Sequence, residues 1–357
     1  MSGRVLPQRE LNRALLARQL LLERQRLEVA QAVERICAIQ GQWSPSPYIA
    51  LWSRLEGFER EELTRAFAER QVVKATLMRI TLHVLSSRDF LALAPLWQAH
   101  RRDEFARRGG DADAVASRIG AALADEPRTH ADLYKAFPDT YNWRARSLLA
   151  LVHVPPSGTW RYHGPTHLTT AESWLRQPLG PPAAGAELLV ERYLAAFGPA
   201  SQGDLLRFAG LRVKEVKAGM DALAPRLVRY RGEDGRVLLD LEGAPLPPAE
   251  TPAPVRFLPK WDSAILAYDR RARILPAAYA KTVIHKNGDV IPTFLVDGAV
   301  AGSWEIARRR EVAALQLTPF EKLPRRVERE LIAEGERLAR WIEDDATAFE
   351  VGWTTVS

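Results

Sequence analysis

The 357 residues exceed the size at which one hydrophobic core usually stops growing, so we expect two or more domains. Contents of 46% hydrophobic and 26% charged residues are typical of a soluble protein. The sequence contains no apolar run of roughly 20 residues and no signal-peptide region, which indicates a cytoplasmic protein. The single cysteine, Cys37, excludes an internal disulfide and a thiolate metal cluster, while the formal charge of +6 favours a polyanionic partner.

The first part of the chain, residues 1–110, has the element order of a winged helix. Apolar residues at helical spacing predict helices over 8–23, 27–40, 48–54 and 60–69, followed by strands over 72–77 and 79–85. Ser86 then offers an N-cap for a helix through His100. Cys37 lies on the apolar face of the second helix, where we expect it to pack as a small buried residue.

A repeated motif indicates two further modules of the same kind. Residues 127–133 and 199–205 share the pattern Pro-x-Ser/Thr-x-x-Asp-Leu, in which the hydroxyl caps a helix and the aspartate answers the free backbone amide. We predict a winged-helix domain over 111–180 and another over 186–245. The expected elements after the motifs are a helix near 144–152, a ribbon over 154–168, a helix over 213–223 and a hairpin over 227–241 that turns at 233–236.

Proline- and alanine-rich stretches at 178–185 and 245–254 are expected to be linkers. The remaining C-terminal lobe, residues 250–357, is predicted to be rich in β-strands and to carry one long helix. Its strands are expected over 255–258, 282–285, 290–296 and 299–305, with tight turns at 286–289 and 297–298 and the helix over 325–342.

The most chemically distinctive stretch is Gln40-Gly41-Gln42. Apolar residues precede it at helical spacing, and Pro45 and Pro47 follow it, so both amides are predicted to lie at a helix C-terminus. A carboxamide oxygen can accept a hydrogen bond from water, and its NH2 group can donate to a leaving group. Two such groups can orient one water molecule; a simple helix cap is the alternative interpretation.

This stretch, continued by Ser-Pro-Ser-Pro-Tyr-Ile-Ala-Leu-Trp-Ser-Arg-Leu, resembles the Gln-x-Gln motif of AlkZ-like DNA glycosylases. That family belongs to a winged-helix superfamily that also contains YcaQ. Further similar blocks lie at 78–84, 258–263, 269–275, 292–298 and 302–304. Two positions are informative: Ile80 replaces a glycine that is usual in the family, and Gln42 replaces the aspartate of YcaQ-like relatives.

The resemblance implies an α+β, C-shaped protein in which three tandem winged helices and a β-rich lobe surround a basic, DNA-binding concavity. It also implies a monomeric, monofunctional and cofactor-free enzyme that removes bulky N7-alkylated purines from double-stranded DNA. The implied roles are DNA repair, unhooking of interstrand cross-links or self-resistance to a genotoxic natural product. Gln40 and Gln42 are the expected catalytic residues. The alternative is a DNA-binding regulator that uses the same modules without catalysis.

Basic residues at three places are candidates for DNA binding. Arg79, with His83, alternates with apolar residues and is predicted on the polar face of a ribbon, whose competing interpretation is a solvated or structural face. The other candidates are Lys281, His285 and Lys286, which lead into a predicted turn, and Arg270 and Arg271, which can bind phosphates or pair with local acids. The sequence has no metal-site motif and no phosphate-binding glycine loop.

Overall fold

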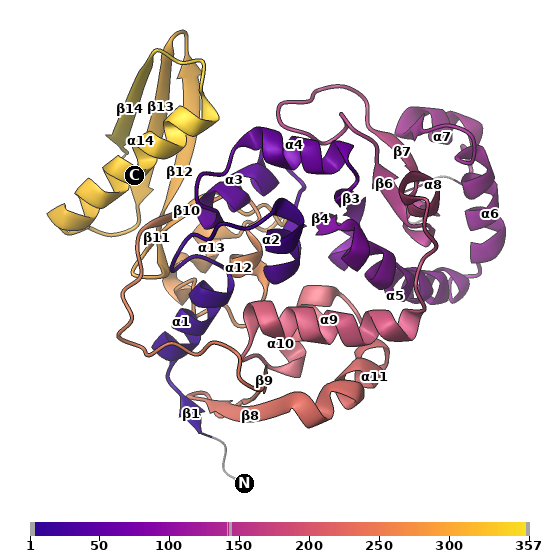
Figure 1. Ribbon diagram of the computed structural model, residues 1–357, viewed down its shortest axis with the longest axis horizontal. Helices are drawn as coiled ribbons and strands as arrows, with labels where there is room; N and C mark the ends of the chain where they lie inside the picture. Colours follow the sequence, from indigo (N-terminus) through magenta and orange to yellow (C-terminus); the bar gives the residue numbers. More distant parts are fainter. Residues whose placement is uncertain (1–3, 141, 143–144, 355–357) are drawn as a thin grey trace.

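The chain folds into an α+β structure, and its described residues form three β-sheets (Figure 1). The computed structural model describes residues 4–140, 142 and 145–354. The strands are β1 (Val5–Leu6), β2 (Ile39–Gln40), β3 (Val72–Thr76), β4 (Leu82–Ser86), β5 (Arg128–Thr129), β6 (Leu151–His153), β7 (His167–Thr170), β8 (Leu227–Gly232), β9 (Val237–Leu241), β10 (Arg256–Leu258), β11 (Thr293–Val296), β12 (Ala299–Arg309), β13 (Val312–Pro319) and β14 (Ala348–Trp353). They form a six-stranded sheet in the order β2-β4-β3-β6-β7-β5, a three-stranded sheet β1-β8-β9 and a five-stranded sheet running from β10 to β14 in sequence order.

The helices cover these sheets and fill the space between them (Figure 1). They are α1 (Gln8–Arg18), α2 (Val29–Arg35), α3 (Pro45–Arg54), α4 (Arg60–Ala68), α5 (Ser87–Ala106), α6 (Ala112–Ala122), α7 (His130–Ala136), α8 (Ala171–Leu175), α9 (Pro182–Phe197), α10 (Gln202–Ala209), α11 (Val213–Leu223), α12 (Ser263–Leu266), α13 (Ala280–Val283) and α14 (Arg325–Ile342). Over the described ranges, every helix is too short or too polar to cross a bilayer.

The helix expected over 27–40 was predicted too long. α2 ends at Arg35, and Cys37 and Ala38 follow with φ angles of 59° and 74°. These left-handed conformations turn the chain out of the helix, and residues 39–40 then extend and pair as β2. The two glutamines were expected at a helix C-terminus. They lie instead at the edge of a sheet.

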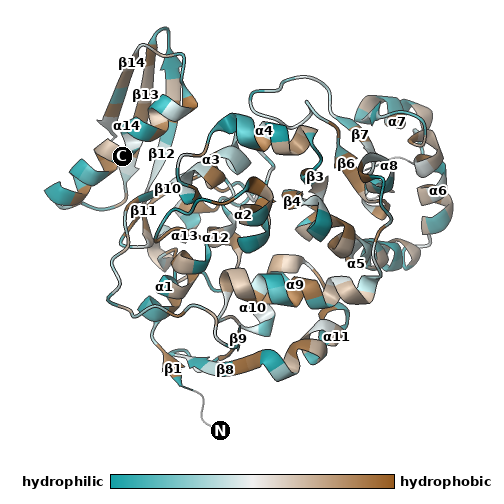
Figure 2. Ribbon diagram, viewed as in Figure 1, coloured by the Kyte–Doolittle hydropathy of each residue, from teal (hydrophilic) through white to brown (hydrophobic). Residues whose placement is uncertain are grey.

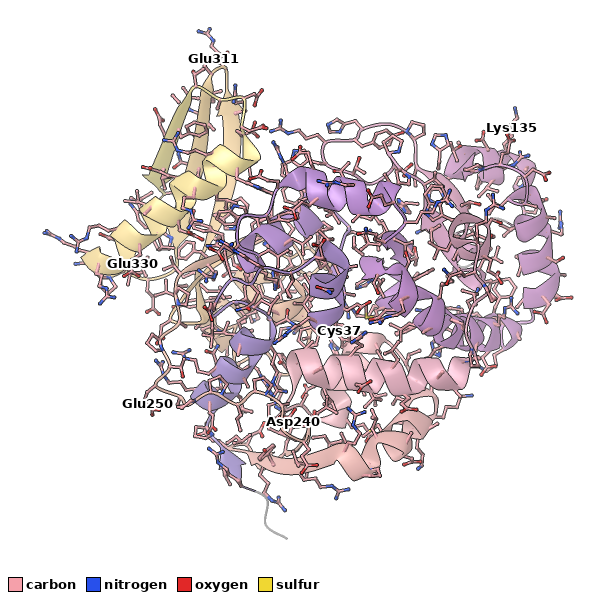
Figure 3. The ribbon with its side chains drawn as sticks, viewed as in Figure 1. Cys37, Lys135, Asp240, Glu250, Glu311 and Glu330 are labelled. Atoms are coloured by element: carbon pink, nitrogen blue, oxygen red, sulfur yellow. The ribbon has the colours of Figure 1, made fainter. Side chains whose placement is uncertain are left out.

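The position of Cys37 agrees with the prediction that it packs as a small buried residue. The side chain is buried in the interior of the protein, where Figure 3 labels it, and it forms no disulfide. Burial, assisted by the carboxylate of Asp89, raises the pKa of the Cys37 thiol far above its ordinary range. The thiol is therefore uncharged at neutral pH and serves as a small apolar residue.

Both repeated motifs form the helix starts predicted for them. Thr129 caps α7 and Ser201 caps α10. In each capping box the carboxylate of the aspartate three residues later accepts a hydrogen bond from the backbone amide of the cap residue. The cap predicted at Ser86 is also confirmed, because its hydroxyl accepts from the Asp89 amide at 3.1 Å. The local sequence was sufficient to predict these helix starts, because each motif itself supplies the acceptors for backbone amides that have no partner within the helix.

The elements after the second motif match the prediction better than those after the first. α11 spans the expected 213–223, and β8 and β9 form the expected hairpin. After the first motif, Arg144 lies outside the described residues, and the helix expected up to 152 is wrong, because a short 3₁₀ turn at Ala145–Leu148 is followed by strand β6. The ribbon predicted over 154–168 forms with other bounds: β6 and β7 pair antiparallel, residues 167–168 belong to β7, and 154–166 form the loop between the two strands.

The C-terminal lobe contains more strands than predicted. β10, β11 and β12 lie at or near their expected places, whereas the strand expected over 282–285 is wrong, because 280–283 forms helix α13. Strands β13 and β14 were missed, and β14 joins the sheet in parallel after α14. α14 spans its predicted residues, and Figure 2 shows hydrophobic and hydrophilic residues sharing this helix, as expected for one that covers a sheet.

Two of the sheets contain strands from more than one predicted domain. Ala75 of β3 pairs with Val152 of β6, so the six-stranded sheet continues from the first expected domain into the second. β1, from the N-terminus, pairs in parallel with β8 of the third expected domain. The linker expected over 178–185 is partly helical, since α9 begins at Pro182, whereas 245–254 contains neither helix nor strand. The domain boundaries themselves stay a prediction.

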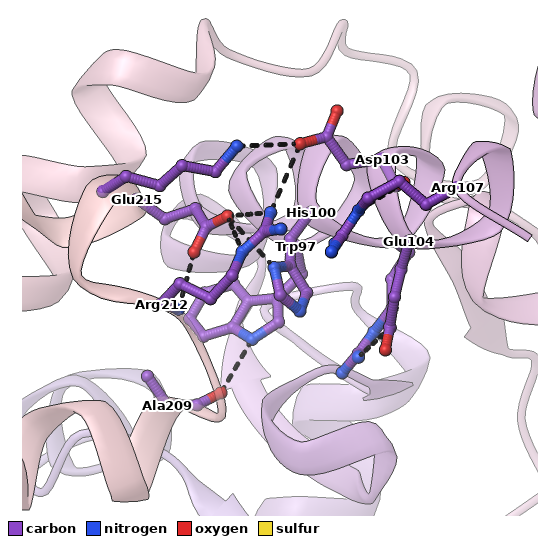
Figure 4. A network of polar contacts seen from close by, with 10 residues as sticks. Trp97, His100, Asp103, Glu104, Arg107, Ala209, Arg212 and Glu215 are labelled. Carbon is purple, nitrogen blue, oxygen red and sulfur yellow. Dashed lines mark hydrogen bonds and ion pairs between the residues drawn. The ribbon is translucent and has the colours of Figure 1, made fainter.

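Polar contacts join modules that are distant in sequence. Figure 4 shows α5 beside α11, where Nδ1 of His100 lies 3.2 Å from a carboxylate oxygen of Glu215. In the same network the indole of Trp97 donates to the Ala209 carbonyl oxygen at 3.0 Å, and Lys214 binds Asp103 at 3.0 Å. These contacts hold α5 against α11 and the end of α10.

A buried ion pair connects α3 to the C-terminal lobe. The guanidinium of Arg54 binds both carboxylate oxygens of Asp262 at 2.8 and 2.9 Å, and each side chain is only 1% exposed. Asp262 also caps α12 by accepting from the Ala264 amide at 2.9 Å. Because neither charge has access to solvent, each depends on the other.

Removal of one partner of this pair should therefore be severe. We expect Asp262→Ala to lower the free energy of unfolding by about 3 to 5 kcal/mol, because it leaves the Arg54 charge buried and unpaired. Urea denaturation followed by circular dichroism measures this loss. Glu56→Ala is the control, since it breaks the solvent-exposed Arg26–Glu56 pair and should have a much smaller effect. Equal effects of the two substitutions would contradict the assignment.

Candidate active site

The Gln40-Gly41-Gln42 segment is fixed by the backbone of β4. In the antiparallel pairing of β2 with β4, Gln40 lies opposite His83. The Gly41 amide donates to the Leu82 carbonyl oxygen at 2.8 Å, and the Leu82 amide donates to Oε1 of Gln42 at 3.1 Å. The Gln42 side chain thus supplies the acceptor that a longer strand would have supplied from its backbone, and its position relative to the sheet is set.

Gln40 and Gln42 differ in their access to solvent. Gln40 is 4% exposed, and its Oε1 accepts a hydrogen bond from Nη2 of Arg79 at 3.1 Å. Gln42 is exposed. Each amide oxygen has two acceptor positions, so Gln42 retains one that can bind water. The structure therefore provides one buried, oriented amide and one accessible amide, separated by a glycine.

Arg79 was expected on the polar face of a ribbon. It lies instead in the turn between β3 and β4. This 3₁₀ turn, Met78–Ile80, places Arg79 at φ 52° and Ile80 at φ 56°. A β-branched residue is disfavoured in the left-handed region, which explains physically why glycine suits the position of Ile80. The turn aims the Arg79 side chain at Gln40.

The same arginine joins the turn between β3 and β4 to the end of α10. Its guanidinium donates to the Phe208 carbonyl oxygen near the end of α10 and lies 5.4 Å from the centre of the Phe208 ring. At Gly210, whose φ is +66°, a Cβ atom would come within 3.2 Å of the Arg79 backbone. Close packing of the turn on this helix end thus holds the group that orients Gln40.

Arg79, which binds Gln40, has two further arginines from separate parts of the chain around it. Burial, followed by the positive charges of Arg207 and Arg271, lowers the pKa of Arg79 to about 10. Burial and Arg207 likewise lower the pKa of Arg271. Arg79 and Arg271 were candidates from sequence, whereas Arg207 was missed, because its place on the exposed side of α10 is not distinctive in the sequence.

His83 does not lie on an exposed polar strand face, and its burial agrees with the alternative interpretation as a structural residue. It is 1% exposed, and its Nδ1 lies 3.0 Å from the Thr81 carbonyl oxygen. Burial and then the Arg79 charge lower the pKa of His83 to about 3. The ring is therefore neutral at physiological pH and lies opposite Gln40 in the β2–β4 pairing as a structural residue.

A pocket of about 160 Å³ borders Gln42. Because Ala75 and Val152 share one sheet face with Gln40, alternation places their chain neighbours on the opposite face. Five of these opposite-face residues line the pocket, namely Thr76, Leu82, Leu151, His153 and Leu168. Gln40 and the pocket thus belong to different faces of the sheet, and Gln42 reaches the pocket from the sheet edge.

The pocket also contains basic groups that the sequence did not single out. His153 is 9% exposed, and burial, followed by the charges of Lys74, His130 and Arg146, lowers its pKa to about 3. Burial and then Arg146 lower the pKa of His130. Among the described lining residues there is no carboxylate.

Lys74 is a second basic residue buried beside the motif. Its Nζ lies 3.3 Å from Oγ of Ser44 and 3.5 Å from the Gly158 carbonyl oxygen, and burial lowers its pKa to about 8. A Cβ on Gly158 would come within 2.7 Å of the Lys74 side chain, so that glycine gives the lysine its space. The sequence signal that could have identified Lys74 is a single lysine inside an apolar strand.

The remaining DNA-binding candidates are exposed in the C-terminal lobe. Lys281, His285 and Lys286 lie on α13 and the turn after it, and Arg270 pairs with Asp234 at 3.3 Å. The indole of Trp261, which lies outside the turn, donates a hydrogen bond to the carbonyl oxygen of Gly288 within the turn at 2.9 Å.

A further hydrogen bond connects this turn to the glutamine segment. Ser46, four residues after Gln42, donates to the carbonyl oxygen of Lys260, the neighbour of Trp261, at 2.9 Å. The Nζ of Lys260 in turn lies 3.1 Å from a carboxylate oxygen of Asp289 in the 285–289 turn, so the turn is linked through Lys260 to the chain that follows the motif. The basic turn and the motif are thus held together through α3.

The arrangement is suited to positioning water. The described residues hold no cluster of three or more His, Cys, Asp or Glu side chains with the geometry of a metal site. The accessible polar groups at the motif are amides, which orient water through hydrogen bonds but do not take its proton.

The two neutral histidines predict a dependence of stability on pH. Each has a folded pKa of about 3, whereas an unfolded histidine has a pKa near 6.5, so between these values only the unfolded chain takes up the protons. The free energy of unfolding should fall as pH drops from 7 to 4, by up to about 1.4 kcal/mol per pH unit for each histidine.

Urea titrations over this pH range measure the effect. We expect His153→Gln to unfold with a shallower pH dependence than the parent chain, because one of the two buried groups is removed. His163→Gln alters an exposed loop residue and should keep the parent slope. Identical slopes for the parent and His153→Gln would contradict a neutral, buried His153.

Comparison with known proteins agrees with these observations. The family model described as DNA glycosylase AlkZ-like matches residues 33–341. An interstrand DNA cross-link repair glycosylase from Streptomyces sahachiroi is 26% identical over 351 residues, covering 86% of this chain and 90% of the relative.

The solved structure of the DNA glycosylase AlkZ from the same organism superposes with a TM-score of 0.77. At 19% identity it covers 99% of this chain and 100% of that chain, so this similarity shows a shared fold. The family match includes the glutamine motif, the six-stranded sheet and most of the C-terminal lobe. The chain therefore belongs to the AlkZ-like family of DNA glycosylases.

Proposed function

We propose that this protein hydrolyses the N-glycosidic bond of bulky N7-alkylated purines in double-stranded DNA and acts as a monomer. Interstrand cross-links formed through such adducts are included among its substrates, so the enzyme acts in DNA repair or in self-resistance to a genotoxic natural product. The observation that carries the proposal is the exposed side-chain amide of Gln42. Its oxygen accepts a hydrogen bond from the Leu82 backbone amide, and it lies next to the side-chain amide of Gln40, which Arg79 orients. Family membership supports a glycosylase over the regulator considered as the alternative.

We further propose that three winged helices and the C-terminal lobe form a C-shaped body around a basic concavity. The hairpin β8-β9 after α10 and α11, and the strand pairs β3-β4 and β6-β7, support this interpretation. Arg79, the two arginines around it and the basic turn at 285–289 would then face the phosphates of the duplex. Such contacts position DNA without reading its sequence, as a lesion-directed enzyme requires.

The chemistry explains why amides are sufficient. N7-alkylation makes the purine cationic, so the glycosidic bond is already weakened and the base leaves without protonation. The remaining work is to place a water molecule near the anomeric carbon and to accommodate an oxocarbenium-like sugar, which positioning and fixed dipoles can do. We assign orientation of the water to Gln42, and support of that water or of the sugar to Gln40.

The environment of each glutamine fits its assigned role. Gln42 is exposed and keeps a free acceptor position on an oxygen that is already fixed by Leu82. Gln40 is held by Arg79, so its dipole cannot rotate freely. Preorganised dipoles of this kind require little reorganisation when charge develops on the sugar.

Substitution of the two glutamines tests the assignment. We expect Gln42→Ala and Gln40→Ala each to lower the single-turnover rate of base release from an N7-alkylguanine duplex by about 100-fold or more, because an oriented polar group is lost. Gln71→Ala is the matched control, as Gln71 is an exposed glutamine that binds Glu69. Near-normal excision by both motif variants would refute the assignment, and operator binding without base release would favour a regulator.

Charge removal in the C-terminal lobe tests the DNA-binding surface. We expect Lys281→Ala combined with Lys286→Ala to weaken duplex binding and to reduce the slope of log affinity against log salt by about 1 for each phosphate that the variant no longer binds. Fluorescence anisotropy at several salt concentrations measures both quantities. Lys322→Ala, at another exposed position of the lobe, should retain the parent slope, and an unchanged slope in the double variant would contradict the proposed surface.

A further inference from the structure

The pocket beside Gln42 contains buried polar atoms that lack a partner. Nδ1 of His153, a residue that is more than nine-tenths buried, forms no hydrogen bond within the described structure, and neither does the buried Nε of Arg146. Both residues line the pocket. A buried polar atom without a partner is costly, so two of them at one cavity indicate a missing hydrogen-bonding occupant.

The size and lining of the pocket restrict that occupant. Its volume of about 160 Å³ is close to the roughly 150 Å³ of an engineered protein cavity that binds benzene, so it can hold one aromatic ring system. The walls formed by Ile80, Leu82, Leu151 and Leu168 are apolar. An inorganic anion would leave these walls without contacts.

The polar side of the pocket selects acceptors. Arg146 can only donate hydrogen bonds, and the described lining offers no carboxylate that would favour a cation. His153 is neutral at physiological pH and can complement either a donor or an acceptor with Nδ1, according to its tautomer. A flat, uncharged ring that carries a carbonyl or hydroxyl oxygen satisfies both the walls and the donors.

We propose that this pocket binds an aromatic ring bearing a hydrogen-bond acceptor, supplied either by the departing purine or by an aromatic substituent on its N7. The inference rests on the proposed glycosylase function, because Gln42 is shared by the pocket and the candidate active site. A ring bound here lies beside the amide that orients the water. Occupancy of the pocket thereby selects the adducts that the enzyme removes.

Direct binding tests the pocket without requiring catalysis. The probes are the free bases 7-methylguanine and 7-benzylguanine, titrated against the full-length protein by calorimetry. Thr166→Phe fills the pocket from the loop before β7, and Arg146→Met removes the donors while keeping a side chain of similar length. We expect both variants to bind at least one probe about tenfold more weakly than the parent.

The control is His163→Phe, which introduces the same ring into the same loop at an exposed position outside the pocket. It should bind both probes like the parent chain. Thermal unfolding verifies that each variant is folded, and the two pocket variants act by different means, so misfolding of one leaves the other informative.

Excision assays then distinguish the two sources of the ring. If the purine occupies the pocket, Thr166→Phe should slow release of both 7-methylguanine and 7-benzylguanine from a duplex. If the N7 substituent occupies it, only release of 7-benzylguanine should slow. Either result supports the pocket.

The proposal is overturned if neither base binds the parent saturably, or if both pocket variants bind them like the parent. This failure differs from failure of the proposed function. Loss of excision in Gln42→Ala with unchanged binding by the pocket variants would reject the pocket alone. Altered probe binding by a protein that releases no base from alkylated DNA would reject the glycosylase and keep the pocket.

Discussion

The pairing of β2 with β4 is the constraint on which the candidate active site depends. It places Gln40 opposite His83 and lets the backbone of Leu82 bind both Gly41 and the side chain of Gln42. An amide on a flexible loop would lose conformational entropy whenever it ordered a water molecule. Here that cost is met during folding, because the strand and its partner are already part of a six-stranded sheet.

The surroundings of this strand connect the site to distant parts of the fold. Arg79 binds Gln40 and the end of α10, and Ser46 donates to the Lys260 carbonyl oxygen. The buried Arg54–Asp262 pair holds α3 to the C-terminal lobe. Hydrogen bonds and ion pairs with little access to solvent depend strongly on geometry, so these contacts fix the modules relative to the motif.

The two faces of the sheet divide the proposed work. Gln40 shares its face with His83 and is supported by Arg79, whereas the pocket residues His153 and Leu168 lie on the opposite face. Gly41 separates the two amides at the sheet edge, and Gln42 is the residue that reaches the pocket. In the proposed reaction the base departs as a neutral molecule, so this division is sufficient: the residues proposed here place a water molecule and hold a ring without protonating the base.

Several features of this protein were determined by the sequence alone. The caps at Ser86, Thr129 and Ser201 and the elements α11, α14 and β8-β9 formed as predicted, because each depends on residues that are neighbours along the chain. The family resemblance also came from the sequence and was confirmed, because its motifs extend over most of the chain.

Tertiary structure decided the environment of those motifs. The left-handed turn at Cys37 and Ala38 converted an expected helix end into strand β2, and the sheet buried His83 and Gln40. The pocket at His153 required β6 to pair beside β3, a contact between segments far apart in sequence. Periodicity shows which residues favour burial, but which segments pair depends on the free energy of the whole packed sheet, and no local pattern encodes it.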